Sequence, residues 1–215
     1  MNSKPGIPIW QVDAFADRPF VGNPAAVCIL ESYPRDDWMQ SVAEEMNLSE
    51  TSFVVPADGD NTFHLRWFTP VTEVDLCGHA TLATVHTLVE NNHVDVRAPI
   101  RFHTRSGELC CRWDGTIVTL DFPSNAATND VGEARSNALL TSLGIAEGVV
   151  MQTKYDLVVV VGDADVVQSM RPDFNALALI ETRGVMVTAA SRESEVDFIS
   201  RFFAPRCGIN EDPVT

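Results

Sequence analysis

Residues that could do chemistry gather in one short segment, Asp75-Leu76-Cys77-Gly78-His79-Ala80-Thr81, which opens a stretch of helical character. The backbone amides of this segment would therefore form a helix N-terminus. Such amides, with the positive end of the helix dipole, bind carboxylates and phosphates. The segment predicts an anion site. Simple capping of the helix by Asp75, with Gly78 present for close packing, is an equally simple interpretation.

Two side chains of this segment are candidates for chemistry. His79 would lie in the first helical turn, where the dipole disfavours imidazolium and a neutral donor or acceptor is expected. Cys77 at the same terminus could be an activated nucleophile, although a small buried thiol is the simpler interpretation because nothing in the sequence places a base beside it. His79 and His86 lack the four-residue spacing of a helical zinc pair, so no metal site is predicted.

A carboxylate on a second predicted helix is a further candidate. Between residues 36 and 47, apolar residues recur at spacings of three and four, which predicts an amphipathic helix. Glu45 follows Trp38 by seven residues and Val42 by three, which turns it toward the apolar face. A carboxylate beside apolar neighbours suits a general base or acid. A solvated position at the rim of that face is the alternative.

The elements that must position these residues are mostly strands. Alternation in residues 9–15 and an apolar run in 25–30, with turn residues between them, predict a hairpin. Residues 78–90 are apolar or small on nearly every face, which is typical of a buried helix. Further strands are predicted at residues 53–55, 63–68, 100–103, 109–113 and 116–122.

The second half of the chain repeats the first in outline. Residues 123–135 are rich in Ser, Asn, Asp, Gly and Ala and are predicted to be a linker, which gives halves of 1–122 and 123–215. Strands are predicted at 155–161 and 184–189, and short helices at 166–170 and 174–179. Arg66-Trp67-Phe68-Thr69-Pro70 followed by Asp75 is echoed by Arg201-Phe202-Phe203-Ala204-Pro205 followed by Asp212. This echo suggests two related halves that face one site.

The composition excludes several classes of function. The 215 residues contain 15 Lys and Arg against 30 Asp and Glu, a formal net charge of −15, which argues against binding to nucleic acid or to anionic membranes. No apolar run approaches the length of a membrane span, and the first residues lack the apolar core of a secretory signal. A cytoplasmic protein is expected. The five cysteines include no C-x-x-C pair, so reduced thiols are predicted.

An ordered set of motifs resembles the PhzF-like family of phenazine biosynthesis. The matching segments, which span nearly the whole chain, are Val12-Asp13-Ala14-Phe15, Phe20-Val21-Gly22-Asn23-Pro24-Ala25-Ala26-Val27, Glu45-Met46-Asn47-Leu48-Ser49-Glu50-Thr51, Arg66-Trp67-Phe68-Thr69-Pro70, Cys77-Gly78-His79-Ala80-Thr81, Ser106-Gly107, Asp121-Phe122-Pro123, Phe203-Ala204-Pro205, Gly208-Ile209, Glu211-Asp212-Pro213 and Thr215.

The resemblance implies a diaminopimelate epimerase-like α/β (α+β) fold. Two pseudo-symmetric halves would each wrap a curled, mostly antiparallel sheet around a central helix. The family pattern continues past Thr215, so the second half is expected to be incomplete. The implied activity is that of an isomerase without metal or cofactor, acting by proton transfer on a small carboxylate-bearing substrate, and a homodimer is expected.

The same resemblance assigns roles to individual residues. Glu45 would be the general base and acid, His79 and Asp212 would hold the substrate, and the Gly78 amide would bind its carboxylate. In the related epimerases two cysteines act as paired acid and base. Cys77 corresponds to one of them and Thr215 stands in place of the other, which disfavours racemisation by two thiols. An epimerase or racemase using Cys77, and a non-catalytic small-molecule-binding protein with this fold, are the alternatives.

Overall fold

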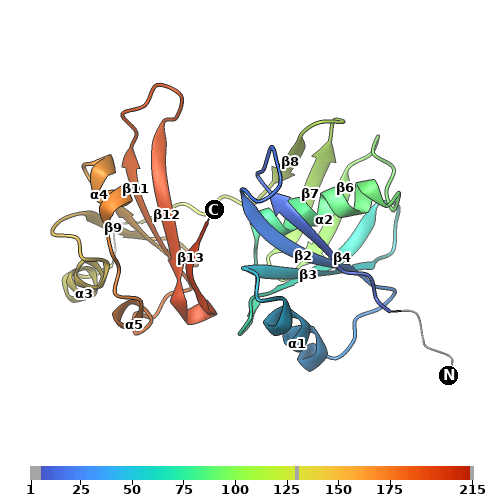
Figure 1. The fold of residues 1–215 in the computed structure, drawn as a ribbon, viewed down its shortest axis with the longest axis horizontal. Helices are drawn as coiled ribbons and strands as arrows, with labels where there is room; N and C mark the ends of the chain where they lie inside the picture. The colour runs from blue at the N-terminus through green and yellow to red at the C-terminus, as the bar shows by residue number, and fades with distance from the viewer. Residues whose placement is uncertain (1–5, 129–130, 214–215) are drawn as a thin grey trace. The chain divides into compact units, whose positions relative to one another are not determined.

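The structure is a computed structural model that describes residues 6–128 and 131–213. The chain divides into two compact units, Met1–Pro123 and Ser124–Thr215, coloured blue to green and yellow to red in Figure 1. Each unit contains one sheet with its own helices. The mixed α/β class expected from the sequence is therefore confirmed, and most strand pairs in both sheets are antiparallel.

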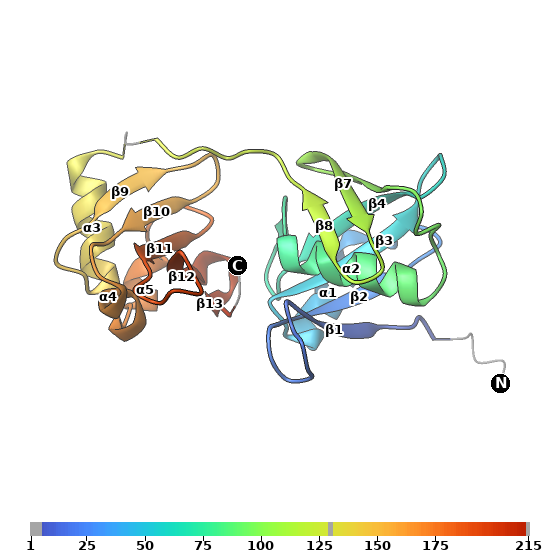
Figure 2. The same cartoon turned by 90° about the horizontal axis from the view of Figure 1, so that it is seen from above.

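The sheet of unit 1 has the strand order β1-β2-β3-β4-β6-β7-β8, with β5 paired to β4. Parallel pairing occurs between β2 and β3 and between β4 and β6. The strands curl around one helix, α2, which Figure 2 shows from above. The strands are β1 (Trp10–Ala14), β2 (Asn23–Ile29), β3 (Glu50–Pro56), β4 (Thr62–Phe68), β5 (Glu73–Val74), β6 (Ile100–Thr104), β7 (Gly107–Trp113) and β8 (Val118–Asp121).

The helix inside the sheet, α2 (Gly78–Glu90), is buried as its composition predicts. Ala80, Ala83, Val85 and Leu88 belong to the same apolar cluster as the inner residues of the strands. The three buried threonines of this helix donate their hydroxyls to carbonyls four residues earlier, at 2.6 to 2.8 Å. Their polar groups are thus satisfied within the helix, so it can be buried on nearly every face.

A second helix, α1 (Asp36–Met46), packs on the opposite face of the same sheet. Its buried residues are Met39 and Ala43, which lie against Phe53 and Val55 of β3. The helix ends at Asn47 in the left-handed conformation, with φ of 50°, a role that Asn tolerates well. Strand β3 therefore lies between two helices, and its residues alternate between α1 and α2.

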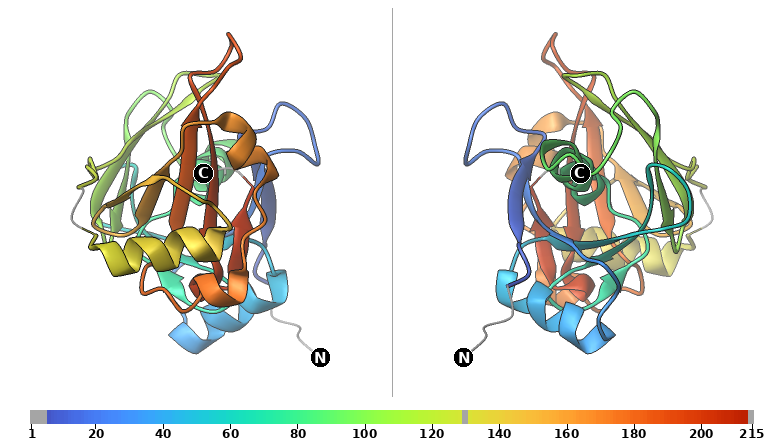
Figure 3. Two further views of the ribbon diagram at one scale, coloured as in Figure 1. Left: turned by 90° about the vertical axis from the view of Figure 1, so that its left-hand side faces the viewer. Right: turned by 90° about the vertical axis from the view of Figure 1, so that its right-hand side faces the viewer.

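Unit 2 has a five-stranded sheet of order β13-β12-β11-β10-β9, in which β10 and β11 are parallel. Side chains of its helices and of its central strands form one apolar core. Figure 3 shows these elements in two further views. They are α3 (Glu133–Leu143), β9 (Val149–Gln152), β10 (Leu157–Val160), α4 (Ala164–Ser169), α5 (Phe174–Leu177), β11 (Val185–Ala190), β12 (Phe198–Ala204), a 3-10 turn (Pro205–Cys207) and β13 (Ile209–Asp212).

The first five strands of unit 1 and the five strands of unit 2 pair in the same order along the chain. In each, the first pair is antiparallel, the second parallel, and the third and fourth antiparallel. The Arg66–Glu73 ion pair between β4 and β5 has a counterpart in Arg201–Glu211 between β12 and β13. This repeat underlies the echo seen in the sequence. The predicted linker is shorter than expected, because α3 begins at Glu133.

Among the described residues, no helix is both long and apolar enough to cross a membrane; the longest is α2 with 13 residues.

Candidate functional site

The alternation of β3 aims a carboxylate at the N-terminus of α2. Phe53 and Val55 face α1, whereas Val54 belongs to the cluster around α2. Ser52, on the same face as Val54, donates its hydroxyl to the Ala80 carbonyl at 3.2 Å. Two residues earlier, Glu50 therefore points to this side as well, because side chains two apart in a strand share a face.

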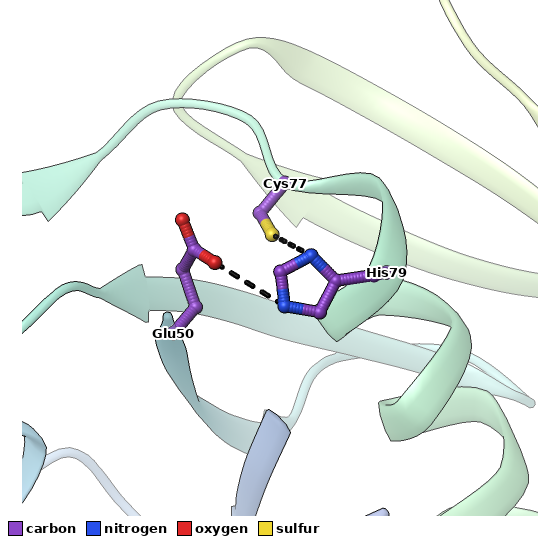
Figure 4. A group of neighbouring side chains, drawn as sticks. All are labelled: Glu50, Cys77 and His79. Carbon is purple, nitrogen blue, oxygen red and sulfur yellow. Dashed lines mark hydrogen bonds and ion pairs between the residues drawn. The ribbon is translucent and has the colours of Figure 1, made fainter. Parts of the chain in front are cut away.

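Glu50, Cys77 and His79 form one cluster, drawn in Figure 4. His79 Nε2 lies 3.2 Å from Glu50 Oε2, and His79 Nδ1 lies 3.5 Å from Cys77 Sγ. The imidazole thus stands between the carboxylate and the thiol, with one ring nitrogen toward each. Cys77 and His79 are buried, and the Glu50 side chain is only 13% exposed.

Burial keeps the imidazole neutral. Loss of hydration disfavours the charged ring and lowers the pKa of His79 from 6.5 to about 4. A neutral ring carries one hydrogen. Cys77 Sγ lies within hydrogen-bonding distance of Nδ1, whereas the contact of Nε2 with Glu50 has an ion-pair distance without the geometry of a hydrogen bond. The expectation of a neutral histidine at this helix end agrees with the direction of this pKa shift.

The N-terminus of α2 differs from the expected capping arrangement. The N-cap residue is Cys77 rather than Asp75, and its side chain makes no capping hydrogen bond within the described part of the chain. Asp75 lies in the turn after β5, where its carbonyl accepts from the Ser106 hydroxyl at 2.8 Å. Capping by Asp75 is therefore wrong, and the amides of the first turn remain the groups that a helix leaves for an anion.

Close packing does not explain Gly78. A Cβ at this position would lie 3.5 Å from Phe122 Cε2, which is an ordinary contact. The protein therefore has room for a Cβ atom there.

The structure separates Glu45 from this cluster. Glu45 is exposed on α1, which packs on the other face of the sheet from α2. The exposure of Glu45 agrees with the predicted solvated position at the rim of the apolar face, and the alternative orientation toward that face is wrong. The residue that reaches His79 is Glu50, five positions later in the same motif and not singled out in the sequence. No pattern in the sequence marks Glu50, because its burial comes from the helices that pack on both faces of β3.

The remaining predicted residues lie elsewhere in the chain. Asp212 is half-buried at the end of β13 in unit 2, where it pairs with Phe202. Thr215 lies outside the described residues. Their predicted roles rest on the resemblance alone.

The cluster also offers ligand types that metals use, since one carboxylate oxygen, one thiol and one ring nitrogen lie within 4.8 Å of one another. As placed, however, the ring turns Nδ1 toward Cys77 and Nε2 toward Glu50. One ion bound to a single ring nitrogen would not reach both other groups without rotation of the ring.

Comparison with known proteins decides the family. The family model described as phenazine biosynthesis-like protein, PhzC-PhzF, matches residues 12–215. The chain belongs to this family. The predicted resemblance is confirmed, and with it the diaminopimelate epimerase-like fold.

Relatives of this PhzF-family chain include uncharacterized isomerases. One from Pseudomonas aeruginosa is 52% identical over 208 residues, which are 96% of this chain and 76% of that protein. One from Halalkalibacterium halodurans is 47% identical, covering 97% of this chain and 77% of that protein. A crystal structure of a PhzF-family protein from Enterococcus faecalis superposes with a TM-score of 0.80 at 40% identity, covering 97% of this chain and 77% of that one.

Proposed function

We propose that this protein is an isomerase without metal or cofactor that moves a proton on a small, carboxylate-bearing substrate, and that Glu50 removes and returns the proton. The observation that carries the proposal is the largely buried Glu50 carboxylate beside a neutral imidazole at the N-terminus of α2. The names of the relatives, which are isomerases, support the reaction class.

Each group at the helix terminus has a role in this reaction. The first-turn amides at Gly78 hold the substrate carboxylate, because the helix dipole and the N–H groups both favour an anion there. His79, neutral at physiological pH, acts as a hydrogen-bonding group and not as a positive charge. Glu50, screened from water, serves as base and then as acid. Asp212 stays a predicted substrate-holding residue on the grounds of the resemblance.

The test is hydrogen exchange into a panel of small carboxylates dissolved in heavy water, followed by NMR. Wild type should exchange a carbon-bound proton of at least one of them, and Glu50→Gln should slow that exchange by about 10³-fold, within the range of general acid–base catalysis. Glu45→Gln is the matched control, since the same change is made on the opposite face of the sheet. It should exchange at the wild-type rate.

The outcomes separate the alternatives. Full exchange by Glu50→Gln together with loss in Glu45→Gln would overturn the assignment and restore Glu45. Binding of the carboxylates by wild type without exchange would favour a non-catalytic binding protein.

The contact of Cys77 with His79 supports a second candidate function, that of an epimerase that uses the thiol. In that case Cys77→Ala should abolish exchange while Glu50→Gln spares most of it. Under the proposed function Glu50→Gln is the damaging change.

A further inference from the structure

One end of the sheet in unit 2 gathers basic side chains from four separate segments. They are Arg135 on the first turn of α3, Lys154 in the turn after β9, Arg183 just before β11, and Arg206 in the 3-10 turn after β12. With neighbouring polar residues they line a cavity of about 300 Å³. Because β9 and β12 end here while β10 and β11 begin here, the strand order brings these segments together.

The charge at this cavity is opposite to that of the chain as a whole. The chain has a formal net charge of −15, yet the cavity is lined by four cations and only two carboxylates, Asp156 and Glu181, so its lining has an excess of positive charge. Asp156 accepts from Nε and from a terminal nitrogen of Arg183, and this ion pair neutralises itself. Glu181 is exposed, and its backbone carbonyl accepts from Arg135.

The other three cations have no carboxylate partner. Within the part of the chain that the structure describes, Arg135, Lys154 and Arg206 form no ion pair, whereas most of the arginines do. The chain has twice as many acidic as basic residues, so partners are plentiful. Arg135 also lies in the first turn of α3, where the helix dipole disfavours a cation. Helix stability therefore does not explain its position, but a bound anion would.

Neutral groups hold these cations in place without cancelling their charge. Arg135 donates to the side-chain oxygen of Gln152 at 2.8 Å, and Lys154 donates to the Tyr155 hydroxyl at 2.8 Å. Arg206 makes one long contact, of 3.5 Å, with a backbone carbonyl. A guanidinium has five N–H donors and an ammonium has three, so each of these groups keeps donors for a ligand.

We propose that this cavity binds the phosphate group of a small molecule, held by Arg135, Lys154 and Arg206. A phosphate monoester carries a charge of about −1.5 to −2 at neutral pH, which complements the excess of cations, and its oxygens suit the planar guanidinium groups. The cavity lies at the lower end of the range of small-molecule sites, which is about 300 to 1,000 Å³, so the ligand is compact.

This site goes beyond the proposed function and does not depend on it. All of its residues belong to unit 2, whereas Glu50, Cys77 and His79 belong to unit 1. A polymer of phosphates is not the ligand, because nucleic acid is bound by extended basic surfaces and this chain is strongly acidic.

The test is a titration of the full chain with inorganic phosphate at constant ionic strength, followed by NMR of the backbone amides. Saturable shifts are expected at residues 153–156 and 181–183. Arg206→Gln and Lys154→Gln should each weaken the affinity about tenfold, the effect of losing one hydrogen bond to a charged group. Arg112→Gln is the matched control, because Arg112 is an exposed cation on β7 of unit 1. It should leave the affinity unchanged.

The choice of variants keeps folding apart from binding. Arg206 and Lys154 are exposed, so their replacement by Gln should leave the amide spectrum of the rest of unit 2 in place. Arg135→Gln should weaken binding too, but it also breaks the hydrogen bond to Gln152, so the decision rests on the two exposed positions.

Other anions test the chemistry of the ligand. Sulfate, a dianion of similar shape, should compete with phosphate, and acetate should bind at least tenfold more weakly. Acetate that binds as tightly as phosphate would overturn the phosphate assignment. Shifts that do not saturate, or equal weakening by Arg112→Gln, would show a response to overall charge only and would overturn the site. None of these outcomes alters the substrate exchange by which Glu50 is tested.

Discussion

The third strand of the repeated order, β3 in unit 1 and β11 in unit 2, begins differently in the two units. In unit 1, Thr51 pairs with Phe68, and in unit 2, Val185 pairs with Phe203 at the corresponding place. The Arg66–Glu73 and Arg201–Glu211 ion pairs support this alignment, because each arginine lies two residues before the phenylalanine of its unit. The residue that precedes Thr51 on β3 is Glu50, and the residue that precedes Val185 at the start of β11 is Gly184.

The space that a side chain would need at Gly184 is occupied. A Cβ at Gly184 would lie 2.2 Å from Cζ of Phe202, closer than any real contact allows. In unit 1 the same position carries a carboxylate directed at His79. The difference shows that one strand arrangement can present a charged group or an aromatic ring at the same edge. The chemistry therefore follows the choice of residue, and the topology only supplies the place.

The largest expected difference between the units is the loss of stability at low pH. All five histidines lie in unit 1. Because the folded pKa of His79 is about 4 against 6.5 for the free side chain, the unfolded state binds more protons between these values. The stability that comes from burying a neutral His79 is full above about pH 6.5 and is lost as the pH falls toward 4. The loss amounts to about 3 kcal/mol.

Urea unfolding monitored by tryptophan fluorescence measures this effect, because all four tryptophans (Trp10, Trp38, Trp67 and Trp113) belong to unit 1. The quantity of interest is the stability of wild type minus that of His79→Gln, which removes contributions from the carboxylates. It should decrease as the pH is lowered. An increase would mean that His79 is charged and paired with Glu50, and would refute the neutral ring.

A smaller effect is expected from a single methyl group at Gly184. Gly184→Ala forces the Phe202 ring to move and should destabilise unit 2 by about 2 kcal/mol, as overpacking does. Hydrogen exchange resolved by peptide should show faster opening of β11 and β12 and no change in unit 1. Gly107→Ala is a control of the same chemical size with no atom near the new Cβ, although its φ of 101° adds local strain. Normal protection of β11 in Gly184→Ala would contradict the crowding by Phe202.

The repeated ion pair should contribute unequally in the two units. Glu73 is 11% exposed and accepts from Arg66 and Arg105, whereas Glu211 is 37% exposed and accepts from Arg201. Glu73→Gln should therefore lower the stability of unit 1 by about 1.5 kcal/mol. Glu211→Gln, the matched change, should cost about 0.5 kcal/mol in unit 2. Equal effects in fluorescence and peptide exchange would show that the two pairs are interchangeable.

The sequence allowed the elements to be predicted better than the site. The buried helix at residues 78–90 was predicted with its observed bounds, because small and apolar residues on every face leave no surface for water. Helix α1 was predicted from its spacing. The orientation of Glu45 was not predicted correctly, because it was judged from Trp38 and Val42, which lie at the edge of the buried stripe of α1. The centre of that stripe is Met39 and Ala43. Glu45 lies two residues past Ala43 and therefore turns away from the sheet.

Glu50 was missed for a different reason. Strand β3 was expected only at residues 53–55, since Glu50, Thr51 and Ser52 are polar and do not resemble a buried strand. They are covered because helices pack on both faces of β3, a fact of tertiary structure. Two of these side chains face α2: Ser52 donates its hydroxyl to the Ala80 carbonyl, and Glu50 lies beside His79. Periodicity carries no signal for burial of this kind.

The smallest expected change in stability is at Gly78, and it separates folding from binding. Gly78→Ala places a methyl group 3.5 Å from Phe122, an ordinary contact, at the first residue of α2. Since Ala favours a helix over Gly, the stability of unit 1 by tryptophan fluorescence should stay equal or rise by a few tenths of a kcal/mol. The methyl group would nevertheless stand at the amides that we propose bind the substrate carboxylate. Affinity for small carboxylates, measured by NMR titration, should fall about tenfold, with the pH dependence from His79 retained. Undiminished affinity would move the carboxylate away from this helix terminus, and the role of unit 1 would then rest on Glu50 alone.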